Sequence, residues 1–258
     1  MDRIPIWIIF LFTVSIIFIS IELGCKLGKA ARIRSIEKKS LPVSSIASSI
    51  LGMLGFILAF TFNIVSNRYD TKKLLVREEA NAIGTAWLRS RLLPDSERTF
   101  TSDLYKQYID IRLNEGKTFK EDELPNFLKQ SRQIQRRLWS VALVNAKRDL
   151  NSDAGALYLE SINKIIDIHA LRVSQGLRAR LPWILWLVFY ALIILSMVSI
   201  GYETGFSNAE RKWIIIVLAL SFSIVIILIA LLDRSQSTII PISQQPLIDL
   251  RASMEENY

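Results

Sequence analysis

Hydroxyl, aromatic and carboxamide side chains recur at helical spacing within one long apolar segment of this chain. At 3.6 residues per turn they share one face of a helix with Gly52, and the residues of this face are Ser45, Ser49, Gly52, Phe56, Phe60, Asn63 and Asn67. An amide in hydrocarbon must find a partner or water, so a face turned to lipid has no reason to carry Asn63. Polar groups at both ends of an aromatic middle predict the wall of a narrow passage for ions.

Two interpretations of this face stay open on the pattern alone. In the first, several copies of the face surround an axis, and Phe56 and Phe60 form a hydrophobic constriction that gates by dewetting. Ring edges carry partial positive charge, so such a constriction tolerates a passing anion better than aliphatic groups do. In the second, the Ser and Asn side chains form hydrogen bonds to neighbouring membrane helices.

The chain offers few residues for other kinds of chemistry. Its single cysteine, Cys25, excludes an intramolecular disulfide and a cysteine-based metal site. With a single histidine, His169, the chain cannot form a histidine-rich metal site. The order and spacing of its residues suggest no Ser/His/Asp or Cys/His catalytic group. We therefore expect no enzyme, no cofactor and no metal. His169 flanks an apolar helical stripe, which favours a packed or interface histidine, with pH sensing as the alternative.

The face of interest belongs to one of four apolar blocks, which span residues 4–23, 44–65, 181–200 and 213–232. Each block is about 20 residues long, and a helix of that length crosses the roughly 30 Å core of a bilayer. Hydrophobic residues make up 51% of the chain and gather in these blocks, so one soluble core is not expected. The sequence predicts an all-α membrane protein with four transmembrane helices.

A polar segment of helix-forming residues separates the second block from the third. Nothing interrupts the second membrane helix before Pro94, so it is expected to continue into this segment as a long stalk. Ala80 and Gly84 on that stalk allow close helix packing. Further helices are expected at about 95–114, 124–149 and 153–178. The expected divisions are 1–65, 66–181, 182–232 and 233–258.

The formal net charge of +8 comes partly from this segment, because residues 66–181 hold 21 Lys plus Arg against 15 Asp plus Glu. Such charge is typical of protein beside anionic headgroups. The sharper interpretation is that Arg68, Lys72 and Lys73 concentrate anions in a vestibule below Asn63 and Asn67. Arg68 has an alternative role as an interface residue that pairs with Asp70 or Glu78 of a neighbouring subunit. No nucleic-acid-binding motif accompanies the charge, so nucleic acid is not an expected partner.

The basic residues do not decide the orientation in the membrane. Residues 25–43 carry six Lys or Arg and one acidic residue, Glu37, which places that short loop in the cytoplasm by the positive-inside rule. Basic residues also bracket the polar segment 66–180 at both ends. With four spans the two regions cannot both be cytoplasmic, and the charges leave the choice open.

Four spans from one chain are too few to enclose a pore, so a passage requires a closed ring of subunits. At this point a resemblance becomes informative. Residues 60–69, FTFNIVSNRY, resemble the end of the second membrane helix of bestrophins, and residues 78–98 and 232–250 resemble the bestrophin-like membrane proteins of bacteria. Phe56 and Phe60 fall where bestrophins place two of their three apolar neck rings. Gly52 falls at the third, which it would widen unless Met53 turns inward.

The resemblance implies a homo-oligomeric ring, by analogy a pentamer, that conducts chloride or other small anions through a bacterial inner membrane. It also implies that the middle domain and both termini are cytoplasmic. The acidic calcium clasp of animal bestrophins has no counterpart, because Glu255 and Glu256 lie in a tail of different composition. The expected partners are membrane lipid, small anions and further copies of the chain. The alternative function is a non-conducting scaffold or sensor whose helical domain binds a protein, with residues 241–254 as a docking strap.

Overall fold

The computed structural model describes residues 5–34, 43–117, 123–207, 212–234 and 239–256, and every regular element in these ranges is a helix. The elements are α1 (Ile6–Arg34), α2 (Val43–Ser90), α3 (Asp95–Lys117), α4 (Leu124–Arg148), α5 (Asp153–Leu171), the π-helix η1 (Arg172–Arg178), α6 (Trp183–Ser207), α7 (Lys212–Asp233) and α8 (Gln245–Glu256). The prediction of an all-helical chain is confirmed.

Four of these helices are long and apolar enough to cross a membrane, and they cover Ile6–Ile33, Ser45–Ser90, Trp183–Ser207 and Ile215–Asp233. They correspond to the four predicted blocks. Trp7, Trp183 and Trp213 lie near helix ends and are 62%, 72% and 81% exposed. Amphipathic indole rings prefer the level of the headgroups, which agrees with a membrane boundary at these positions. The chain is a multi-pass membrane protein.

The chain divides into two compact units. The membrane unit comprises Met1–Tyr69 and Arg180–Ile240, and the helical unit comprises Asp70–Ala179 and Pro241–Tyr258. The helix α2 is 48 residues long and contributes to both. The predicted continuation of the second apolar helix into the polar segment is therefore confirmed. It ends where the sequence indicates, because α2 stops at Ser90 and α3 begins directly after Pro94.

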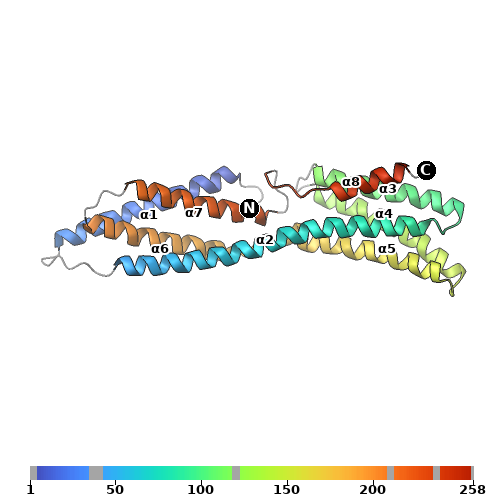
Figure 1. The fold of residues 1–258 in the computed structure, drawn as a ribbon, viewed down its shortest axis with the longest axis horizontal. Helices are drawn as coiled ribbons and strands as arrows, with labels where there is room; N and C mark the ends of the chain where they lie inside the picture. The colour runs from blue at the N-terminus through green and yellow to red at the C-terminus, as the bar shows by residue number, and fades with distance from the viewer. Residues whose placement is uncertain (1–4, 35–42, 118–122, 208–211, 235–238, 257–258) are drawn as a thin grey trace. The chain divides into compact units, whose positions relative to one another are not determined.

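In the membrane unit, α1 and α6 lie side by side with their backbones in contact (Figure 1). Glycines at a spacing of four residues permit this approach on each helix: Gly24 and Gly28 on α1, and Gly201 and Gly205 on α6. A methyl group on any of them would overlap a backbone carbonyl oxygen of the opposite helix. Small residues at such positions allow membrane helices to gain van der Waals contact in the absence of a hydrophobic driving force.

In the helical unit, α3, α4, α5 and α8 gather around the C-terminal half of α2 (Figure 1). Local signals define the helix starts. Pro125 occupies the first turn of α4, where its missing N–H costs nothing. The Ser152 side chain caps α5 by accepting a hydrogen bond from the Gly155 amide at 3.2 Å. The final helix, α8, buries Leu247 and Met254 completely and pairs Arg251 with Asp110 of α3 at 3.0 Å.

Candidate functional site

The predicted face of α2 is uncovered in the single chain. All seven of its members are exposed, with Phe56 at 70% and Phe60 at 65%. The opposite face of the same helix enters the core of the membrane unit through Leu54, Leu58 and Val65. The structure thus brings the seven predicted residues together on one open strip, which we call the α2 face.

The polar members of the α2 face form hydrogen bonds along their own helix. The Ser49 hydroxyl donates to the Ser45 carbonyl oxygen at 2.8 Å, and Asn67 Nδ2 donates to Asn63 Oδ1 at 2.8 Å. Both bonds join residues one turn apart. They leave the exposed side of each group able to contact water, which suits the mouths of a passage.

The middle of the α2 face consists of two phenylalanines, with Gly52 one turn before them. The Phe56 and Phe60 ring centroids are 6.2 Å apart with the planes inclined by 31°, so the two rings form one continuous apolar band. Gly52, one turn before Phe56, has open space around the position of an absent Cβ, while the neighbouring Met53 is 58% exposed. A ring of such faces would therefore be wider at Gly52 than at the phenylalanines.

Arg68 lies at the end of the α2 face and forms an ion pair within its own chain. Its Nη1 atom lies 3.6 Å from Asp233 Oδ1 at the end of α7. The same Asp233 oxygen accepts a hydrogen bond from the Leu181 amide at 2.8 Å, and the residue is only 6% exposed. In the single chain Arg68 pairs with Asp233, whereas the sequence suggested Asp70 or Glu78 of a neighbour as the carboxylate partner.

The two lysines proposed for a vestibule lie in different environments. Lys73 is exposed, with Nζ 3.4 Å from Asp70 Oδ1. Lys72 is only 5% exposed, because it shares its side of α2 with the buried residues Leu75 and Val76. The structure therefore does not bring these two cations together on an open face with Arg68.

A group of charged and polar side chains lies buried in the helical unit, and sequence reasoning missed it. We call it the buried charge cluster, and its members are Glu79, Tyr108, Arg112, Glu115, Gln135, His169 and Arg172. Glu79 of α2 is at its centre: it pairs with Arg112 Nε of α3 at 3.1 Å and with Arg172 Nη1 of η1. Arg112 Nη1 also pairs with Glu115 one turn further along α3. Charges without any solvent exposure are retained in proteins only when they are paired in this way.

The hydrogen bonds around Tyr108 indicate which ring nitrogen of His169 carries a proton. Tyr108 has one hydroxyl proton, which it donates to Glu79 Oε1 at 2.9 Å. The Tyr108 oxygen accepts from Gln135 Nε2 at 3.1 Å and lies 3.3 Å from His169 Nδ1. His169 must therefore carry its proton on Nδ1 to donate to the same oxygen.

Burial and neighbouring charge keep this histidine neutral. His169 is 5% exposed, which confirms the prediction of a packed histidine. Burial disfavours the imidazolium, and the Arg112 guanidinium repels it, so the pKa of His169 falls to about 4. Burial likewise acts against the charge on Arg112, but Glu79 and Glu115 hold the pKa of Arg112 above its ordinary value.

A signal for this cluster exists in the sequence. Glu79 lies three and four residues from Val76 and Ile83, and beside Ala80, all of which are buried. This helical spacing places Glu79 on the packed side of α2 and leaves Glu78 half-buried. The two adjacent carboxylates therefore have different environments.

The chain matches the model of a known protein family, the Bestrophin-like domain, over residues 35–247. The match covers most of the chain and includes the α2 face, the buried charge cluster and Asp233. No curated protein and no solved structure matches the sequence.

Proposed function

Because the chain belongs to the bestrophin-like family, we propose that it forms a passive ion channel in which copies of α2 surround the pore. The observation that carries the proposal is the α2 face, where a membrane helix exposes Asn63 and Asn67 beside two phenylalanines. Carboxamides against acyl chains are costly, and a shared aqueous centre removes that cost.

The pore of this channel lies between subunits. The α2 face points away from the core of its own membrane unit, so one chain cannot enclose it. A ring with cyclic symmetry places every copy of the face on the axis, and closure prevents open-ended assembly. Five copies is the number suggested by the resemblance to bestrophins. The same resemblance favours a bacterial inner membrane with the helical unit and both termini in the cytoplasm.

Anions are the favoured ions. No charged side chain lies on α2 between Ser45 and Asn67, so the pore wall itself carries no carboxylate ring that would select cations. The phenylalanine edges offer partial positive charge. Arg68 adds a cation near one mouth, although its pairing with Asp233 reduces its field there.

Flux through reconstituted protein tests the proposal. Purified full-length protein in liposomes is expected to pass chloride in response to a gradient. Phe60→Ala is expected to raise the chloride flux severalfold, because it removes one of the two apolar rings. Phe62→Ala is the matched control, since Phe62 lies on another side of the same helix and is 38% exposed. Liposomes that pass neither chloride nor potassium, with or without the Phe60 change, would exclude the channel and favour the scaffold alternative.

A further inference from the structure

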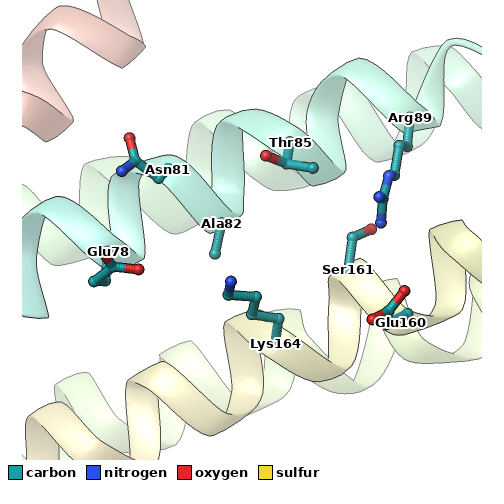
Figure 2. A pocket seen from close by; sticks show the side chains of 8 residues that line it. All are labelled: Glu78, Asn81, Ala82, Thr85, Arg89, Glu160, Ser161 and Lys164. Atoms are coloured by element: carbon teal, nitrogen blue, oxygen red, sulfur yellow. The ribbon is translucent and has the colours of Figure 1, made fainter.

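A polar groove lies between α2 and α5 within the helical unit (Figure 2). Its volume is about 190 Å³, several times the roughly 30 Å³ that one water molecule occupies in the liquid. α2 contributes Glu78, Ala82 and Arg89 to its lining, and α5 contributes Glu160, Ser161 and Lys164. The groove is separate from the α2 face and from the buried charge cluster.

Small residues create the space, and one hydrogen bond closes an end of it. Ala82 and Ser161 are each 4% exposed and lie where longer side chains would fill the gap between the helices. Arg89 crosses from α2, and its Nη1 donates to the Leu157 carbonyl oxygen of α5 at 2.6 Å. Figure 2 shows the Arg89 side chain extending toward Ser161, while Glu78 lies at the opposite end.

The charges in the groove balance, yet they do not pair with one another. Two are acidic, Glu78 and Glu160, and two are basic, Arg89 and Lys164. Among the described residues, no ion pair joins any of these four, although Glu160 and Lys164 are one turn apart on α5. Lys164 instead points across the groove toward Ala82 (Figure 2). A groove with separated charges of both signs offers an acceptor and a donor for charge-assisted hydrogen bonds at different places.

We propose that this groove binds a small zwitterion, a molecule of amino-acid size with one ammonium and one carboxylate group. Glu78 accepts from the ammonium at one end, and Arg89 donates to the carboxylate at the other. The Lys164 amine, which lies between these two ends beside Ala82, donates a second hydrogen bond to the carboxylate (Figure 2), and the Thr85 hydroxyl and Asn81 amide supply neutral hydrogen bonds from α2. The lining is neutral in sum and Ala82 is its only apolar residue, so a simple anion, a simple cation or an apolar molecule fits it less well.

The test uses binding to purified full-length protein in detergent, so it does not depend on ion conduction. The probe is β-alanine, followed by ligand-observed NMR titration. Saturable binding with a Kd of about 1 mM or tighter is expected, which is attainable for a ligand of this size. Propionate and propylammonium, which each lack one of the two charges, are expected to bind at least about tenfold more weakly, the loss typical of one charge-assisted hydrogen bond.

Variants locate the site. Glu78→Gln and Lys164→Gln are each expected to weaken β-alanine binding by about tenfold or more. Asp103→Asn and Lys129→Gln are the matched controls, because both are exposed charges of the helical unit outside the groove. Absence of β-alanine binding, propionate binding as strongly as β-alanine, or equal effects in groove and control variants would each overturn the proposal.

Discussion

At the residue scale, Glu79 differs from its neighbour Glu78 because it forms ion pairs with two arginines, Arg112 and Arg172, inside the helical unit. Glu79→Gln leaves Arg112 and Arg172 without this carboxylate in a site that has no solvent exposure at its centre. Breaking a buried pair by removing one partner costs about 3–5 kcal/mol. We expect that loss in the free energy of unfolding, measured by chemical denaturation of the detergent-solubilised protein.

Glu78→Gln is the control for this measurement, since it makes the same chemical change one residue earlier, on the half-buried side of α2. An exposed or half-exposed substitution of this kind is expected to change stability by no more than about 0.5 kcal/mol. Equal effects of the two changes would show that the buried charge cluster does not stabilise the unit as described.

His169 makes the stability of the helical unit depend on pH in a defined direction. Its folded pKa of about 4 lies below the unfolded value of 6.5, so unfolding takes up a proton at intermediate pH. The contribution of the neutral imidazole is complete above about pH 6.5 and is lost as the pH falls toward 4. The expected loss is about 3 kcal/mol by pH 4.

The measurement compares the unfolding free energy of the parent protein at pH 7 and pH 4 with that of His169→Gln. Glutamine keeps a hydrogen-bonding group near Tyr108 but does not titrate. Between pH 7 and pH 4 the unfolding free energy of the variant should therefore fall by about 3 kcal/mol less than that of the parent protein. All other titrating groups are common to both proteins. Identical pH profiles would mean that folding does not lower the pKa of His169.

Sequence alone could predict that His169 is packed, but not what it contacts. The apolar spacing around it on α5 indicates a buried side, whereas Tyr108 is 61 residues away in the chain and Glu79 lies a further 29 residues before Tyr108. Which polar groups meet in a core depends on how three or four helices dock, and the period of one helix does not contain that information. The same limit explains why Asp233 was not foreseen as the partner of Arg68.

At the scale of elements, the close contact of α1 with α6 depends on glycines. In Gly201→Ala the added methyl group would overlap the Ile21 carbonyl oxygen, which is backbone and cannot rotate away. The two helices must then separate and lose contact along their length. Overpacking typically costs about 1–3 kcal/mol, and we expect at least that loss in resistance to unfolding by denaturing detergent.

Gly55→Ala in α2 is the matched control. A methyl group there meets open space, so the change is expected to be neutral or to stabilise by up to about 1 kcal/mol through helix propensity. If both substitutions behaved alike, the α1 and α6 backbones would not be in contact in the membrane.

The elements themselves were largely predictable, because hydropathy and proline placement act locally. The four spans, the extension of α2 and the start of α3 after Pro94 all follow from such signals. The glycine pairs at a spacing of four in α1 and α6 are visible in the sequence too, and they follow the same small-residue rule as Ala80 and Gly84. The π-helix of η1 carries no comparable local signal. It begins at Arg172, which pairs with Glu79, so its placement depends on a tertiary contact.

At the scale of the whole molecule, the proposed ring gives the α2 face a property that a lipid-facing helix lacks, namely contact with water at mid-membrane depth. Phe56 is the best position to test, since it is 70% exposed in the single chain and is turned to the axis in the ring. Replacing the only native cysteine gives a Cys25→Ser background in which Phe56→Cys is the sole thiol.

A charged, membrane-impermeant methanethiosulfonate reagent is expected to modify this thiol in liposomes and to reduce chloride flux by most of its value, because thiolates react only where water reaches them. Ile224→Cys on α7 is the control: Ile224 is 60% exposed in the single chain but lies on a different apolar helix, where lipid is its expected neighbour. That position should remain unmodified, with flux unchanged. If the reagent spared Phe56→Cys, or modified both positions at the same rate, α2 would not line an aqueous pore and the ring arrangement would have to be abandoned.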